Sequence, residues 1–283
     1  MKAKKIKMLA AELVNILASQ RFLDKTGLSA QRVRDIAGRE YWEQIIAKRF
    51  PIRERLTCAE VLAFCQEPMA EISETPEEGW LPFIYQFGCA VLYPDEEAQE
   101  RFQPYHAAAY FYLTVLQFFL DEERKVLPPE KFMDFELLEA EEYERFESRS
   151  EYALFLKAWR EDYVYELFRL NMEATSFKTL EHVAGVHYVS MFVARALYDV
   201  GVPIDLALVS GAAAGHDLGK FGCKPGEAVP HMHYYYTDRW FNRHQINYIG
   251  HIAANHSTWD LEPERLSVES LVLIYADFCV KQE

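Results

Sequence analysis

Apolar residues recur along most of this chain at the three- and four-residue spacing that is typical of amphipathic α-helices. Near the N-terminus, Ile6, Leu9 and Leu13 follow this spacing. The alternation of apolar and polar residues that marks a half-buried strand is hard to find anywhere in the sequence. We therefore predict an all-α fold, with a helical bundle in the C-terminal part and a helical region before it.

Several residues indicate where helices begin, bend or end. Thr57 is followed three residues later by Glu60, the spacing of a capping box. A long helical pattern covers 95–120, and Pro104 inside it is expected to break or kink the helix. Farther along, Pro203 is expected to open a helix and Gly219 to end one. Two more helices are predicted over 179–201 and 268–281.

The nine histidines divide the chain into two regions. One of them, His106, lies in the first 181 residues, whereas the others fall between His182 and His256. We therefore predict two domains, an N-terminal helical region of unknown role over 1–172 and a domain that carries the chemistry over 173–283.

Charge and cysteine content narrow the class of protein. Lys and Arg number 30 against 44 Asp and Glu, a net charge of −14, which argues against a general nucleic-acid binder. The five cysteines are scattered and form no CxxC pair, as expected of reduced thiols in a cytoplasmic protein. No apolar run reaches the ~18–20 residues needed to span a bilayer. We expect a cytoplasmic protein without a membrane partner.

The segment 211–222, GAAAGHDLGKFG, places an imidazole next to a carboxylate. Neighbouring residues on a helix diverge by about 100°, so His216 and Asp217 can face one metal ion only where the helix ends or bends. The run of small residues from 211 to 215 permits close helix packing.

Further ligands should come from other helices. His182 and His187 are five residues apart, about 140° around a helix, and so cannot comfortably serve the same ion. His182 shares an apolar stripe with Val186 and is the better candidate. Asp277 lies in an otherwise apolar helix, where an unpaired carboxylate is costly, so it requires a cation or a proton.

These residues resemble the HD-domain superfamily of metal-dependent phosphohydrolases. The likeness rests on T179-x-x-H182, then H216-D217-x-G219-K220, then A276-D277. The resemblance implies that His182, His216, Asp217 and Asp277 ligate a divalent metal ion. It also implies catalytic roles for Asp217, which would bridge metals or orient water, and for Lys220, which would face the substrate phosphate.

The segment 255–260, NHSTWD, is similar to the HHERWD-type string of the HD-GYP branch. By this likeness His256 would help to hold a second metal ion together with either His231 or His233. Asn255 stands where that branch has a histidine, and LEPERL follows in place of the GYP signature. We expect His187, His244 and His251 to have supporting roles.

The implied function is hydrolysis of a phosphate mono- or diester, in a small and nucleotide-like substrate, by metal-activated water. One or two ions of Mn, Fe, Ni, Co, Mg or Zn suit a His/Asp site without thiolates. The alternative is a degenerate HD domain that binds a nucleotide or a metal ion as a regulatory module. Because HD domains usually continue beyond the late aspartate, we also expect the polypeptide to extend past Glu283.

Overall fold

The computed structural model describes residues 2–94, 100–129, 134–175, 178–256 and 265–280, and these residues contain helices but no strand. The prediction of an all-α fold is confirmed. Within the described ranges, no helix combines the length and the apolar character that crossing a bilayer requires. The chain divides into two compact units, the first formed by 1–90 and 94–128 and the second by 91–93 and 129–283.

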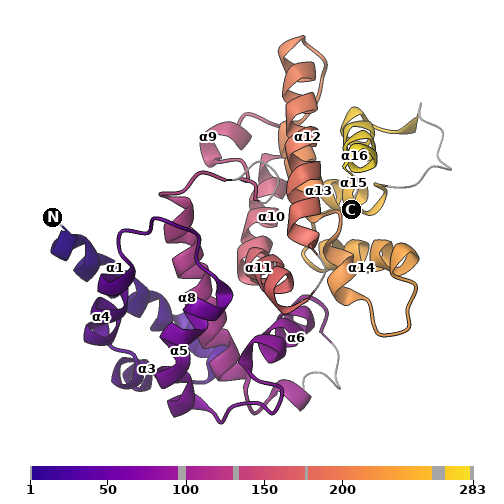
Figure 1. Cartoon of the computed structure of the whole chain (residues 1–283). Coiled ribbons are helices and arrows are strands. Elements are labelled where there is room, and N and C mark those ends of the chain that lie inside the picture. Colours follow the sequence, from indigo (N-terminus) through magenta and orange to yellow (C-terminus); the bar gives the residue numbers. More distant parts are fainter. Residues whose placement is uncertain (1, 95–99, 130–133, 176–177, 257–264, 281–283) are drawn as a thin grey trace. The chain divides into compact units, whose positions relative to one another are not determined.

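The first unit is built around α8, which is buried along most of its length and packs against α1, α2 and α5 (Figure 1). On α8, Phe111 stacks against Trp42 at a ring-centroid distance of 6.2 Å. Thr57 and Glu60 form the predicted capping box at the start of α5. The described helices that lie wholly or mainly in this unit are α1 (Lys2–Leu17), α2 (Gln20–Thr26), α3 (Ala30–Ile36), α4 (Arg39–Arg49), α5 (Cys58–Ile72), α6 (Trp80–Leu92) and α8 (His106–Arg124).

The predicted break at Pro104 is present, because this residue lies in a turn and α8 begins two residues later. The first part of the expected helix, 95–99, lies outside the described residues.

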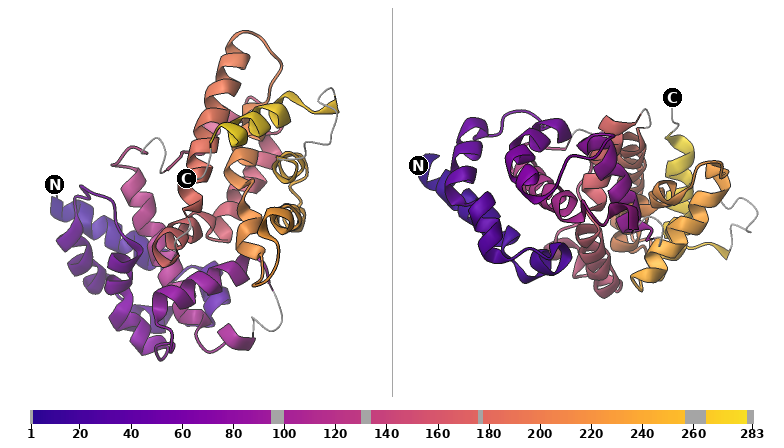
Figure 2. Two further views of the ribbon diagram at one scale, coloured as in Figure 1. Left: turned by 45° about the vertical axis from the view of Figure 1, so that its right-hand side comes forward. Right: turned by 90° about the horizontal axis from the view of Figure 1, so that it is seen from below.

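The second unit is centred on α13, whose residues are almost all buried. Figures 1 and 2 show this short helix among α12, α15 and α16, and it also packs against α10. The elements of this unit are α9 (Ala140–Tyr143), α10 (Arg149–Glu161), α11 (Val164–Ala174), α12 (Thr179–Asp199), α13 (Leu206–Gly215), the 3-10 helix η1 (Leu218–Gly222), α14 (Val229–Arg243), α15 (Tyr248–Ala254) and α16 (Val268–Cys279).

The unit boundary differs from the one expected between residues 172 and 173. Helices α10 and α11 belong to the second unit, since α10 packs on α13 and α11 packs on α12. The change in histidine content therefore lies inside a compact unit and comes just before the first candidate metal ligand, His182.

Small residues on α13 allow the neighbouring helices to approach closely. A Cβ added at Gly211 would lie 2.9 Å from the Ile249 side chain, and one at Gly215 would lie 2.6 Å from the Phe241 ring. The start of α13 is set by Asp205, whose carboxylate accepts the backbone N–H groups of Ala207 and Leu208. Pro203 precedes this cap and does not itself open the helix.

Candidate metal centre

Five elements of the second unit bring histidine and aspartate side chains to one place. His182 lies in the first turn of α12, His216 and Asp217 follow the end of α13, and Asp277 lies on α16. The ends of α13 and α15 matter here because a chain that leaves its helix can present adjacent residues to one point. The two remaining members are His233 on α14 and His256 just after α15.

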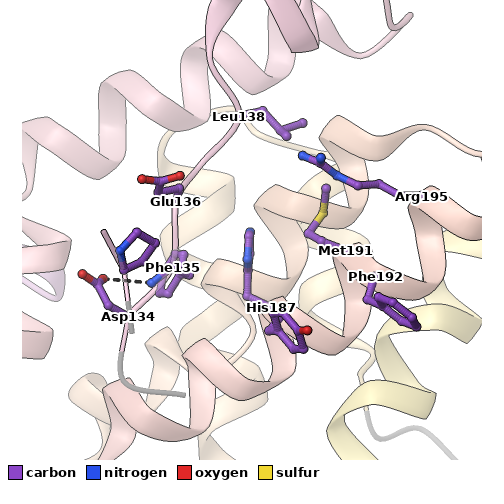
Figure 3. Close-up of a pocket in the computed structure, with 10 residues that line it drawn as sticks. Asp134, Phe135, Glu136, Leu138, His187, Met191, Phe192 and Arg195 are labelled. Atoms are coloured by element: carbon purple, nitrogen blue, oxygen red, sulfur yellow. Dashed lines mark hydrogen bonds between the residues drawn. The ribbon is translucent and has the colours of Figure 1, made fainter. Parts of the chain in front are cut away.

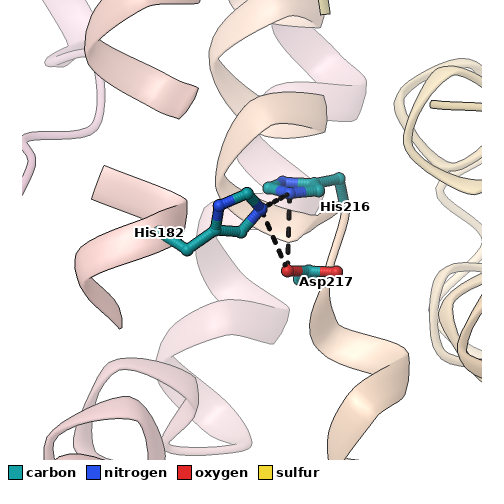
Figure 4. A group of neighbouring side chains, drawn as sticks. All are labelled: His182, His216 and Asp217. Carbon is teal, nitrogen blue, oxygen red and sulfur yellow. Dashed lines mark hydrogen bonds and ion pairs between the residues drawn. The ribbon is translucent and has the colours of Figure 1, made fainter. Parts of the chain in front are cut away.

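The first group of ligand atoms surrounds the Nε2 atom of His182. This atom lies 3.3 Å from Nε2 of His216, 3.4 Å from Oδ2 of Asp217 and 3.1 Å from Oδ1 of Asp277. Figure 4 shows the two imidazoles and the Asp217 carboxylate converging. Ligands held ~2.0–2.2 Å from an ion are themselves roughly 3.0–3.5 Å apart, so the spacing suits one metal ion.

A second group shares Asp217 with the first. Its members are Asp217, His233 and His256, which offer ligand atoms within 4.8 Å of one another. The Nε2 atoms of the two histidines lie 3.4 Å apart, and Oδ1 of Asp217 is 3.8 Å from Nε2 of His233. Asp217 therefore turns one oxygen toward each group, as a bridging carboxylate does.

Hydrogen bonds to backbone carbonyls determine which ring nitrogen carries the proton in three of the histidines. The Nδ1 atoms of His216, His233 and His256 lie 2.7–2.9 Å from carbonyl oxygens. A carbonyl only accepts, so each Nδ1 carries the proton, and the neutral ring has a lone pair on Nε2. Those Nε2 atoms point into the cluster, which is the orientation that metal binding requires.

Burial and charge set the protonation of the cluster. Burial lowers the pKa of His216 to about 4 and also lowers the pKa of His233, so both rings are neutral at pH 7. Burial alone would raise the pKa of Asp217, but at the acidic pH where this carboxyl titrates His216 is protonated, and its charge, with that of Lys220 and other neighbours, outweighs burial and holds the pKa well below its usual range. Neutral imidazoles and an ionised carboxylate are the forms that bind a metal ion.

The pKa of Asp277 is lowered as well. Its burial opposes the shift, but the hydrogen bond from His182 and the nearby histidines prevail. Its Oδ1 atom is also 3.8 Å from Nε2 of His216. The sequence predicts that this carboxylate requires a cation or a proton, and a cation at the first group would meet that requirement.

Lys220 makes an ion pair within the cluster. Its Nζ atom lies 2.6 Å from Oδ2 of Asp217, and its side chain remains 26% exposed. The sequence predicts that this lysine faces a substrate phosphate, and its partial exposure at the edge of the cluster is compatible with that position. Its contact in the structure is with the shared carboxylate.

The structure places His231 and His233 on different faces of α14. Two residues apart on a helix means about 200° of rotation, so only one can face the cluster. His233 is 5% exposed and belongs to the second group, whereas His231 is exposed on the outer face of α14 and lies outside both groups. The geometry therefore favours His233 over His231 as a candidate ligand.

The three histidines expected to have supporting roles lie outside the cluster. His187 hydrogen-bonds to Ser210, and His244 lies 2.8 Å from the carboxylate of Asp162. His251 is exposed and contacts the Asn255 side chain. The Trp259-Asp260 part of the NHSTWD segment lies outside the described residues.

The sequence does not single out Thr237, although it joins the two groups. Its hydroxyl accepts the backbone N–H of Gly219 at 3.0 Å and donates to the carbonyl of His216 at 3.1 Å. Gly219 itself has no positive φ and does not end a helix. A Cβ added at Gly219 would lie 1.7 Å from the carbonyl oxygen of His233, so glycine is needed where η1 crosses α14. The one available signal was the position of Thr237, one turn after His233.

Searches against models of protein families, curated proteins and solved structures find no match to this chain. The structure itself establishes an all-α chain with two adjoining His/Asp groups that could hold metal ions.

Proposed function

We propose that the second unit is a metal-dependent phosphohydrolase of the HD type that acts on a phosphate mono- or diester. The observation that carries this proposal is the pairing of imidazole nitrogens at 3.3 Å and 3.4 Å. In His216, His233 and His256 the proton is on Nδ1, so the 3.4 Å pair consists of two facing lone pairs. Such atoms repel each other unless a metal ion or a proton lies between them.

Two features favour phosphate chemistry over a purely structural metal site. When bound, divalent ions a few Å apart activate water and stabilise the charge of an in-line phosphoryl transfer. The shared carboxylate of Asp217 holds the two groups at such a spacing. Lys220 adds a positive charge at the partly exposed edge, where it attracts an anionic phosphate and offsets charge on its oxygens.

The aromatic ring of Tyr234 supports a nucleotide-like substrate. Its centroid lies 3.9 Å from the ring of His233 and 4.9 Å from that of His256, and the side chain is only half-buried. A planar base can stack on such a ring while its phosphate reaches the cluster. Replacing Tyr234 with Leu should therefore raise KM for a nucleotide and leave turnover of bis(4-nitrophenyl) phosphate nearly unchanged.

The test combines metal analysis with turnover. The full chain is loaded with Mn²⁺, its metal content is measured, and hydrolysis of 4-nitrophenyl phosphate, bis(4-nitrophenyl) phosphate and a nucleotide panel is followed. We expect one or two ions per chain and hydrolysis of at least one substrate class. Asp217→Ala should remove metal and activity together, because it removes the ligand common to both groups.

Two histidines on α14 provide a matched pair of variants. His233→Gln should lose the ion of the second group, whereas His231→Gln should keep full metal content and activity. A folded protein that binds no metal, or Asp217→Ala with full activity, contradicts the proposal. A metal-loaded protein that is inactive on every substrate favours the regulatory module instead.

A further inference from the structure

A cavity of about 370 Å³ lies on a different face of α12 from His182. Figure 3 shows His187, Met191 and Arg195 on successive turns of this helix, facing the segment 134–138. Its volume falls within the ~300–1,000 Å³ range of small-molecule sites. The lining is mainly apolar, and its members are Pro129, Asp134, Phe135, Glu136, Leu138, His187, Tyr188, Met191, Phe192 and Arg195.

His187 and Asp134 are the deeply buried polar side chains of the described lining, and a chain of hydrogen bonds holds His187. His187 is only 5% exposed, and its Nε2 atom lies 3.0 Å from the Ser210 hydroxyl. That hydroxyl is 3.0 Å from the hydroxyl of Tyr152, which in turn accepts the backbone N–H of Leu138 at 2.9 Å. The Phe135 ring packs against the imidazole at a centroid distance of 4.8 Å.

The direction of this chain can be deduced from its members. If Ser210 donated to Tyr152, the tyrosine hydrogen would have no acceptor among the described residues. If Tyr152 donates to Ser210 and Ser210 donates to Nε2 of His187, each hydroxyl hydrogen has an acceptor. Burial lowers the pKa of His187 to about 3, so the ring is neutral. Its proton is therefore on Nδ1, which has no partner among the described residues.

The charges around the cavity select against a charged ligand. Among the described residues of the lining, Arg195 contributes the one cationic group, but its guanidinium is paired with Glu142 at 2.9 Å. Asp134 and Glu136 place two carboxylates on the opposite wall, which disfavours an anion. A cation would lose hydration in a mainly apolar cavity, where the buried His187 presents a hydrogen-bond donor rather than an acceptor.

We propose that this cavity binds a neutral, largely apolar small molecule whose hydrogen-bond acceptor pairs with Nδ1–H of His187. The apolar body of the ligand lies against Met191, Phe192 and Leu138. This site is separate from the His/Asp cluster, and the proposal holds whether or not the cluster is catalytic.

A series of matched probes tests the ligand class on the full chain. The probes are 2-acetylnaphthalene, its acceptor-free analogue 2-isopropenylnaphthalene, the anion 2-naphthoate and the cation 2-naphthylmethylammonium. Titration calorimetry gives the Kd values, and histidine-ring ¹H–¹⁵N spectra report the Nδ1 proton. We expect the ketone to bind at least ~5-fold more tightly than the other three, because one hydrogen bond contributes about that factor.

Exposed aromatic residues supply variants that should fold normally. Phe192 is 67% exposed on the rim, and Phe192→Ala should weaken ketone binding roughly threefold or more. Tyr248 is 71% exposed on α15, outside the cavity, and Tyr248→Ala should leave the Kd unchanged. Ser210→Ala should shift the His187 ring signals and weaken ketone binding.

Four results would overturn the proposal, of which three concern the probes. They are no binding of any probe, equal binding of the ketone and its acceptor-free analogue, and tighter binding of either charged probe. Equal ketone affinity in Phe192→Ala and the unmodified chain would place the ligand elsewhere and would also overturn it.

Discussion

His182 and His187 lie five residues apart on α12 but occupy opposite chemical settings. His182 faces two carboxylates and another imidazole, whereas His187 faces one hydroxyl group and an aromatic ring. Both side chains are largely buried. Burial therefore does not distinguish a candidate metal ligand from a histidine of the core, but the charge of its neighbours does.

The sharpest test of this comparison replaces each histidine with glutamine. His182→Gln should lower Mn²⁺ affinity by ~100-fold or more, because even changes outside the ligand set cost 10–100-fold. His187→Gln should alter it less than ~2-fold. Isothermal titration of both variants measures the difference, and similar losses in the two would show that position on α12 does not separate their roles.

Lowering the pH should reduce the stability of the folded chain through His187. The pKa of His187 is about 3 in the folded chain against 6.5 as the reference for the unfolded chain. The unfolded state binds more protons between these values, so stability present above pH 6.5 is lost as the pH falls. At pH 5 the loss is about 2 kcal/mol.

Urea unfolding of the unmodified chain and of His187→Gln at pH 7 and pH 5 isolates this contribution. The variant should lose less stability on acidification by about that amount. Equal losses in both proteins would mean that His187 accepts a proton without cost and is not held neutral.

Much of the fold and part of the site can be predicted from the sequence. The all-α fold follows from local spacing, and the break at Pro104 and the cap at Thr57 depend on neighbouring residues alone. The separation of His182 from His187 follows from the angle between helix positions. Asp277 is recognisable because a carboxylate in an apolar helix requires a partner.

The rest depends on contacts between elements that are distant in sequence. Whether His231 or His233 faces inward is set by how α14 rotates against η1, which no local pattern encodes. The same packing explains why residue 219 is glycine, since any larger side chain there would collide with the backbone of His233. The direction of the hydrogen-bond chain at His187 likewise requires Ser210, Tyr152 and Leu138 to be in place.

Thr237 offers a test with a smaller effect that bears on the metal side of the comparison. Thr237→Val removes the hydroxyl that binds Gly219 and His216 and leaves a buried N–H without its partner. We expect a loss of about 1–2 kcal/mol in the free energy of unfolding and weaker Mn²⁺ binding. Thr237→Ser keeps the hydroxyl and should retain metal affinity, and a valine variant with unaltered affinity would contradict this linking role.

The smallest expected change in the free energy of unfolding concerns His244, which lies in neither the His/Asp cluster nor the cavity at His187. His244, Arg243 and the indole of Trp240 all contact Asp162. Asp162→Asn weakens these charge-assisted contacts and should cost about 1 kcal/mol in urea unfolding at pH 7. Mn²⁺ affinity should stay the same, and a marked fall would show that the contact supports the cluster from a distance.

The shared carboxylate of Asp217 has a thermodynamic consequence. Since one side chain serves both groups, two ions bound there would not fill their positions independently. A first ion would orient the carboxylate for the second and also withdraw part of its negative charge. Whatever factor the first ion imposes on the affinity of the second, the second imposes the same factor on the first. The occupancy of the two positions would then respond to metal concentration as one linked equilibrium.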